Sequence, residues 1–334
     1  MKKANANLMK EINLYNLRQV MKRVETATKP QLAALTELSV VTVNSLVKEL
    51  QSLGEIFEDE TVPSNGGRPA LVYRYNYNFS LAIVVYIKEK QGQVFVSATV
   101  VNLENHILLQ EEYLWPVFDR HHFFEIISRF LTLYPSIKVI GIGIPGQAVN
   151  GEIKVSSHKE LMGVRMIEEM ESRFGLPVMV ENDINAAISG YCAMQDLNDE
   201  LCVLGIYFPT KYPPGMGIVL DGKIVKGKNG MAGEIKFLPM DLDWYDEMGE
   251  ETFVESVCLI LQSVIAVLAP DKIVIYQNLL EADTWNPAWE SYQLRHPQPS
   301  YPEVILQDTF QQDFEAGMRW LTLKELEPSL IQLK

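Results

Sequence analysis

Short apolar runs alternate with helical stretches along the chain from about Phe79 onward. The runs LAIVVYI and VFVSATVVNL predict a β-hairpin, and residues 119–134 have the spacing of a helix. IKVIGIGI and PVMVEN predict buried strands that end at a turn containing Pro and Gly and at Glu181-Asn182-Asp183. Such alternation predicts an α/β body, in which polar groups at the carboxyl end of a strand are a common place for ligand chemistry.

The end of this body has a different composition. Residues 283–310 are rich in Pro and aromatic residues, which predicts a surface excursion or a lobe contact without an evident function. A final helix is expected around residues 311–325.

The length of 334 residues is too great for one average domain, so we expect a head of residues 1–78 and a body of residues 79–334. No apolar run reaches the roughly 18 residues of a membrane span, and the N-terminus lacks the apolar stretch of a signal peptide. Cys192, Cys202 and Cys258 have no CxxC spacing, so buried thiols are expected rather than disulfides or a metal site. These features predict a soluble, cytoplasmic protein that needs no cofactor.

Charge is divided unevenly between the two parts. The chain carries a net charge of −14, but residues 1–78 hold ten Lys/Arg against eight Asp/Glu, which leaves −16 for the remainder. This division disfavours nucleic-acid binding by the whole surface and suits a DNA contact confined to the head.

The head has the pattern of three helices. Apolar residues at helical spacing predict a first helix over about residues 9–25, and Pro30 suits the first turn of a second. Ser39 is expected to cap a third helix that buries one face, ends at Gly54 and exposes polar residues on the other face. This is a helix-turn-helix arrangement, whose second helix would enter the major groove of DNA. The buried face of the third helix comprises Val43, Leu46, Val47 and Leu50.

Two strand-like runs joined by a Gly-rich loop follow and predict a wing. Glycines let the loop backbone approach DNA, and an Arg at its tip suits the minor groove. A head used only for dimerisation or packing is the alternative. The candidate DNA-binding residues are Lys29, Ser39, Thr42, Asn44, Ser45, Lys48, Gly66, Gly67 and Arg68.

Four motifs in order resemble the ROK family of sugar kinases and sugar-responsive repressors, and the match covers nearly all of the body. They are GGRPA at 66–70, GIGIPGQAVNGEI at 141–153, ENDINAA at 181–187 and GKNGMAGEI at 227–235. The resemblance implies a two-lobed, actin-like ATPase body, and the head resembles that of the repressor branch, which includes xylose and N-acetylglucosamine repressors.

The resemblance implies roles for individual residues. Asp183 matches the catalytic base of the kinases, while Asn182 and Glu234 match contacts to sugar hydroxyls. Glu251 matches a further contact loosely, and His158 lies where the family's loop approaches the sugar. The alternative is that Asn182 and Asp183 only cap a helix.

The chain departs from the kinases at the places that hold phosphate. Val85 to Glu89 replaces the Asp-x-Gly-Gly-Thr loop, Pro213 and Pro214 interrupt the second loop, and Gln277-Asn278 replaces the third glycine cluster. Proline has no N–H to donate to phosphate. The family's zinc-binding His and Cys are also absent: Phe237 stands at the His position, so no metal is expected.

The sequence therefore predicts a regulator of carbohydrate genes that is not an enzyme. Its expected partners are double-stranded operator DNA, a sugar or sugar-phosphate effector, and further copies of the chain in a homodimer or homotetramer. A residual sugar kinase and a ligand-independent DNA-binding dimer are the alternatives.

Overall fold

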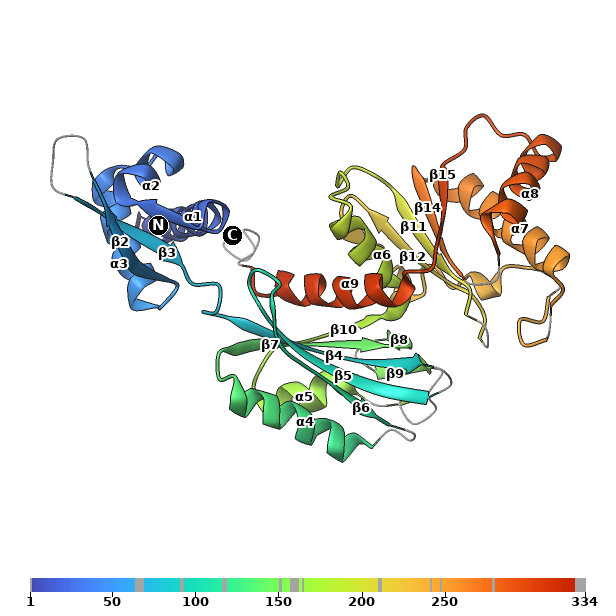
Figure 1. The fold of residues 1–334 in the computed structure, drawn as a ribbon, viewed down its shortest axis with the longest axis horizontal. Helices are drawn as coiled ribbons and strands as arrows, with labels where there is room; N and C mark the ends of the chain where they lie inside the picture. Colours follow the sequence, from blue (N-terminus) through green and yellow to red (C-terminus); the bar gives the residue numbers. More distant parts are fainter. Residues whose placement is uncertain are drawn as a thin grey trace.

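The computed structural model describes residues 2–63, 69–90, 93–115, 119–149, 152–156, 162–163, 165–209, 212–240, 242–246, 248–277 and 280–327. Figure 1 shows a small helical part that holds the N-terminus and two larger parts, each built around one sheet. We call these parts the head, the first lobe and the second lobe.

The three predicted helices of the head are confirmed. α1 (Lys2–Val24) begins earlier than expected, α2 (Lys29–Thr36) follows a capping box formed by Thr28 and Gln31, and α3 (Val40–Ser52) is capped by Ser39. The Thr42 N–H donates to Ser39 Oγ over 3.1 Å. The predicted apolar face of α3 is buried against α1 and α2, with Val43, Val47 and Leu50 all at 0 % exposure.

A three-stranded antiparallel sheet completes the head. β2 (Ile56–Val62) and β3 (Ala70–Tyr75) are the two predicted runs, and β1 (Thr26–Thr28) adds an unpredicted strand on the other side of β3. Arg18 of α1 donates twice to the buried Glu55 carboxylate, over 2.6 Å each. The tip residues Gly66, Gly67 and Arg68 lie outside the described residues.

The first lobe contains the predicted hairpin and strands in a mixed sheet of order β10-β7-β4-β5-β6. α4 (Arg120–Leu133) and α5 (Met166–Phe174) cover one face of this sheet. A small hairpin extends from β7 (Figure 1) and is formed by β8 (Gly146–Val149) and β9 (Glu152–Ser156). The five strands of the sheet are β4 (Leu81–Lys90), β5 (Gln93–Asn102), β6 (Ile107–Leu114), β7 (Ile137–Ile144) and β10 (Val178–Asn182).

The second lobe has a sheet of order β13-β12-β11-β14-β15, covered on one face by α7 (Glu250–Leu268) and α8 (Ala282–Arg295). α7 is the one helix of the described chain that is long and apolar enough to cross a membrane, but Val257, Ile260 and Leu261 are fully buried in the lobe. The strands are β11 (Val203–Tyr207), β12 (Gly215–Leu220), β13 (Lys223–Ile224), β14 (Lys272–Tyr276) and β15 (Glu303–Gln307).

The segment of residues 283–310, predicted as a surface excursion or a lobe contact, contains helix α8 and strand β15 and belongs to the second lobe. α8 accommodates Pro287 in its interior, where proline ordinarily disfavours a helix. Trp285, Trp289 and Tyr292 of α8 are buried in the core of the second lobe. Burial of these large side chains outweighs the local preference.

Two crossing helices join the lobes. α6 (Asp183–Met194) and α9 (Phe310–Lys324), the predicted final helix, lie between the two sheets and share one core with both. Glycines permit a close backbone approach at the crossing: a Cβ at Gly317 would lie 1.8 Å from the Ala186 carbonyl oxygen, and one at Gly190 2.0 Å from that of Asp313. This contact fixes how the lobes meet.

α9 is attached to both lobes and leads to the head. Tyr276 of the second lobe donates to buried Asp313, whereas Lys88 of the first lobe pairs with Glu315 over 3.0 Å. Beyond the helix, Glu327 lies 3.3 Å from Lys22 Nζ of α1. α9 therefore connects the lobe junction to the head.

Candidate functional site

Asn182 and Asp183 lie where strand β10 passes into helix α6, as the sequence predicts. Asn182 Oδ1 accepts the Asn185 N–H over 2.8 Å and caps the helix, while Asp183 Oδ1 accepts the Ile184 N–H over 2.9 Å. The capping interpretation therefore describes how both side chains are held. It leaves their other polar atoms for a ligand, because each carboxyl and amide group can make several hydrogen bonds.

Asp183 and Glu234 lie close enough to interact, although 51 residues of sequence separate them. Burial raises the pKa of Asp183 to about 6, the Ile184 N–H opposes this rise, and the charge of Glu234 adds to it. Glu234 precedes the short 3-10 helix η3 (Ile235–Phe237), and its Oε2 lies 2.8 Å from Lys236 Nζ. Asp183 thus offers a carboxyl group of raised pKa, and Glu234 offers a carboxylate that is ion-paired with Lys236. Two such groups side by side suit the recognition of hydroxyl groups.

The other candidate effector residues are placed differently. Glu251 is exposed on the first turn of α7, and no described interaction joins it to Asp183. His158 lies outside the described residues. Phe237, which the resemblance aligns with the family's histidine, is 70 % exposed, with Lys236 Nζ 5.2 Å from its ring centroid.

Residues that the sequence did not single out support this junction. Glu181 is buried below Asn182, accepts from Asn185 Nδ2 over 3.0 Å and lies 2.8 Å from Lys226 Nζ. The lysine comes from the segment after β13, so this ion pair joins the two lobes. Glu181 precedes Asn182 in the quoted motif, but nothing local in the sequence indicates its partner.

β4 contains the segment that the resemblance aligns with the first phosphate loop of the kinases, and its side chains make contacts within the chain. β4 pairs with β5 in unbroken register from Leu81 opposite Asn102 to Lys90 opposite Gln93. The Tyr86 ring packs edge-on against Phe314 of α9, with centroids 5.4 Å apart. Lys88, whose side chain is 3 % exposed, pairs with Glu112 over 2.5 Å and with Glu315 over 3.0 Å.

Gln277, which the resemblance aligns with the third glycine cluster, also makes contacts within the chain. The Gln277 amide donates to the Leu280 carbonyl oxygen over 2.8 Å and accepts the Leu280 N–H over 2.6 Å. Asn278 lies outside the described residues. The Gln277 side chain thus uses both of its polar atoms for hydrogen bonds to the backbone of Leu280.

The candidate DNA-binding residues described in the head are grouped on α2 and α3. Ser39, Ser45 and Lys48 are exposed, whereas Thr42 and Asn44 are half-buried. The Thr42 hydroxyl lies 2.9 Å from the Ser39 hydroxyl, so it is hydrogen-bonded to the residue that caps α3. The half-buried Lys29 begins α2, with its ammonium 5.2 Å from the Tyr73 ring centroid.

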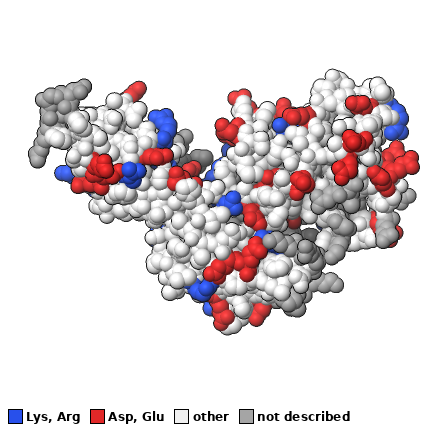
Figure 2. Space-filling model, in the orientation of Figure 1, with Lys and Arg blue, Asp and Glu red and all other residues white. Residues whose placement is uncertain are grey.

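Charge on the surface follows the uneven division in the sequence. Figure 2 shows acidic side chains spread over the face of the two lobes, with only a few basic ones among them. On the head, charges of both signs lie close together in this view. A polyanion such as DNA would meet repulsion over the displayed face of the lobes.

Comparison with known proteins identifies two kinds of relatives, transcriptional repressors and sugar kinases. The sequence model of the ROK family matches residues 90–259. The xylose repressor of Bacillus spizizenii is 24 % identical over 252 residues, which cover 72 % of this chain and 63 % of that protein. The chain thus spans about six-tenths of the length of the curated relatives it matches.

Two solved structures share the fold. A ROK family transcriptional regulator, a homologue of the E. coli MLC protein, superposes with a TM-score of 0.58 at 18 % identity and covers 95 % of this chain and 100 % of its own. A ROK family glucokinase from Streptomyces griseus, solved with glucose and AMPPNP, gives 0.55 at 17 % identity and covers 73 % and 100 %. Repressor and kinase relatives therefore share the α/β architecture of the two lobes.

Proposed function

Because this chain belongs to the ROK family, we propose that it is a cytoplasmic DNA-binding regulator, of the repressor type, for carbohydrate-related genes. Residues 1–78 form a winged helix-turn-helix that binds operator DNA. Residues 79–334 bind a sugar or sugar-phosphate effector and assemble the chain into a homodimer or homotetramer. The observation that carries the proposal is a Ser39-capped helix with an exposed polar face in front of a ROK body.

The exposed residues of α3 support the DNA contact. Ser45 and Lys48 lie on the face opposite the buried Val43 and Val47, so they are free to meet base edges and phosphates. The acidic lobes confine this contact to the head. Few cations lie on α3, so two heads in one assembly would add their affinities.

The filled phosphate positions support a protein that is not an enzyme. Phosphoryl transfer depends on positioned N–H donors and a metal around the phosphates. Here Tyr86, Lys88 and Gln277 use the corresponding positions for contacts within the chain. Asp183 alone cannot supply the missing electrostatic stabilisation.

Coupling between effector and operator follows from the helices. An effector bound by Asp183 and Glu234 contacts the start of α6, and α6 crosses α9 at Gly190 and Gly317. The effector changes operator affinity only if it binds one arrangement of the lobes more tightly than another.

Calorimetric titration of the full-length chain with neutral sugars, sugar phosphates and Mg-ATP tests this function. We expect a sugar-type ligand to bind the wild type, to lose binding in the Asp183→Ala variant, and Mg-ATP to give no heat. Phosphorylated sugar formed in the presence of Mg-ATP would instead establish the sugar kinase, which the raised pKa of Asp183 favours as the second candidate. Absence of any ligand would leave a DNA-binding dimer without an effector.

A further inference from the structure

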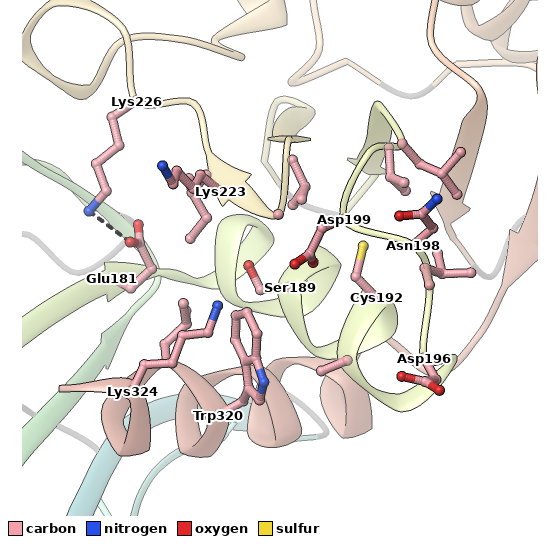
Figure 3. A pocket seen from close by; sticks show the side chains of 18 of the residues that line it. Glu181, Ser189, Cys192, Asp196, Asn198, Asp199, Lys223, Lys226, Trp320 and Lys324 are labelled. Atoms are coloured by element: carbon pink, nitrogen blue, oxygen red, sulfur yellow. Dashed lines mark ion pairs between the residues drawn. The ribbon is translucent and has the colours of Figure 1, made fainter. Parts of the chain in front are cut away.

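A cavity of about 440 Å³ lies between the two lobes, beside the crossing of α6 and α9. Figure 3 shows that its labelled side chains come from four places: strand β10, helix α6 with the loop after it, the β13 segment and helix α9. A volume of this size fits a small organic molecule. Neither Asp183 nor Glu234 lines it, so it is separate from the site described above.

The distance along α6 also separates the two sites. Asp183 begins the helix, and Cys192, which lines the cavity, lies nine residues later. At 1.5 Å per residue this is about 13 Å. The Cys192 end of the cavity therefore lies well away from Asp183, whereas Glu181, two residues before Asp183, lines the other end.

Three lysines gather at one end of the cavity. They are Lys223, Lys226 and Lys324, and the figure shows Lys226 in its ion pair with Glu181; Glu325, next to Lys324 in the chain, lines the cavity as well. Within the described chain, Lys223 and Lys324 have no ion-pair partner. Burial lowers the pKa of Lys324, and nearby Asp199 opposes this fall. Lys223 and Lys324 thus place two cations at one end of the cavity, and an anionic group bound there would stabilise both.

The other end carries hydrogen-bond acceptors and donors. Asp196, Asn198 and Asp199 follow α6 on one loop. Figure 3 shows Asp196 and Asn198 away from the lysines, whereas Asp199 lies nearer to them, and its charge acts on Lys324. Carboxylates accept hydrogen bonds from hydroxyl groups, and the Asn198 amide can donate as well. Trp320 lies between the two ends, with Lys324 Nζ 3.4 Å from its ring centroid. The ring therefore holds the Lys324 ammonium over one of its faces through a cation–π contact.

We propose that this cavity binds a second ligand, a small polyhydroxylated anion such as a sugar phosphate or a sugar acid. Its anionic group pairs with Lys223 and Lys324, and its hydroxyl groups meet Asp199 and Asn198. This ligand is additional to the effector at Asp183.

Binding there acts on both lobes and on the head. Lys223 belongs to the second lobe, whereas Lys324 belongs to α9, so one anion bridges elements that meet at the lobe junction. Lys324 lies three residues before Glu327, which contacts Lys22 of α1. A ligand that holds Lys324 therefore holds the segment that touches the head.

Isothermal titration of the full-length chain tests the site with four probes: glucose 6-phosphate, gluconate, glucose and inorganic phosphate. We expect glucose 6-phosphate or gluconate to bind more tightly than glucose or phosphate. Lys223→Gln and Lys324→Gln should each weaken binding about tenfold or more, since each removes a charge-assisted hydrogen bond. Lys228→Gln is the matched control, because Lys228 is exposed and lies outside the cavity lining.

The Asp183→Ala variant separates this site from the effector site. Retained binding of the anionic polyol in Asp183→Ala, with loss in Lys324→Gln, supports the cavity. Loss in Asp183→Ala with no effect of Lys324→Gln assigns the ligand to the effector site and overturns this inference while leaving the proposed function intact. Inorganic phosphate binding as tightly as glucose 6-phosphate, or no probe binding at all, also overturns it.

Discussion

The contact between α6 and α9 predicts the sign of the stability change on Gly317→Ala. In the interior of an exposed helix, Gly to Ala stabilises by about 1 kcal/mol. At Gly317 the new Cβ would lie 1.8 Å from the Ala186 carbonyl oxygen and 2.6 Å from its carbonyl carbon. The neighbouring atoms are backbone, so the helices must move apart, and overpacking of this kind costs about 1–3 kcal/mol or more.

We expect Gly317→Ala to lower the free energy of unfolding by about 2 kcal/mol and to lower the Tm for unfolding of the lobes by about 4–8 °C. Gly190→Ala should act in the same direction, because its Cβ would lie 2.0 Å from the Asp313 carbonyl oxygen. Gly249→Ala is the control: nothing lies within 4 Å of its Cβ, and its backbone has φ −66°. Differential scanning calorimetry measures all three. A Gly317→Ala variant as stable as wild type, or more stable, would refute the reasoning.

Three further predictions concern buried charges. Arg18→Met leaves the Glu55 carboxylate, which is 4 % exposed, without its partner, so urea titrations should show the head destabilised by about 3–5 kcal/mol. Lys10→Met is the control: it removes the exposed ion pair with Glu49 and should cost under about 1 kcal/mol. Lys88→Met should destabilise the first lobe by about 1–3 kcal/mol in the same assay, and adding Glu315→Gln should recover part of the loss; an unchanged midpoint for Lys88→Met would contradict the buried ion pair. The folded pKa of Asp183, about 6, lies above the ordinary 3.8, so its contribution to stability is full below about pH 4 and is lost as the pH rises to 6. The free energy of unfolding of Asp183→Asn should therefore rise relative to that of the wild type by up to about 3 kcal/mol between pH 4 and pH 6.5. Unfolding free energies of the two proteins that change in parallel with pH would contradict a raised pKa of Asp183.

Local signals allowed the sequence to predict the head helices and most strands. Ser39 followed by Val43, Leu46, Val47 and Leu50 specifies both a cap and a buried face within twelve residues, and the structure contains both. The three-residue β1 is too short to have a pattern of its own. It exists because Thr26–Thr28 pairs with β3, about 46 residues away.

The candidate site was predicted in part for the same reason. The β10–α6 junction has a local signature, and the structure places Asp183 near Glu234. Glu181 and Lys226 are 45 residues apart, and their ion pair depends on how the two lobes meet. Neither periodicity nor capping encodes such a contact, so no local pattern indicates the ion pair or the cavity beside it.

In the proposed function, the head binds a specific DNA sequence and an effector at Asp183 controls this binding. Selection of DNA fragments by the full-length chain, followed by affinity titrations of the enriched fragment with and without the sugar found by calorimetry, tests it most directly. We predict one enriched sequence, weaker binding for Lys48→Glu but not for Lys228→Glu, and an affinity that the sugar changes in wild type but not in Asp183→Ala. Failure to enrich any sequence, or a sugar effect that persists in Asp183→Ala, would contradict it.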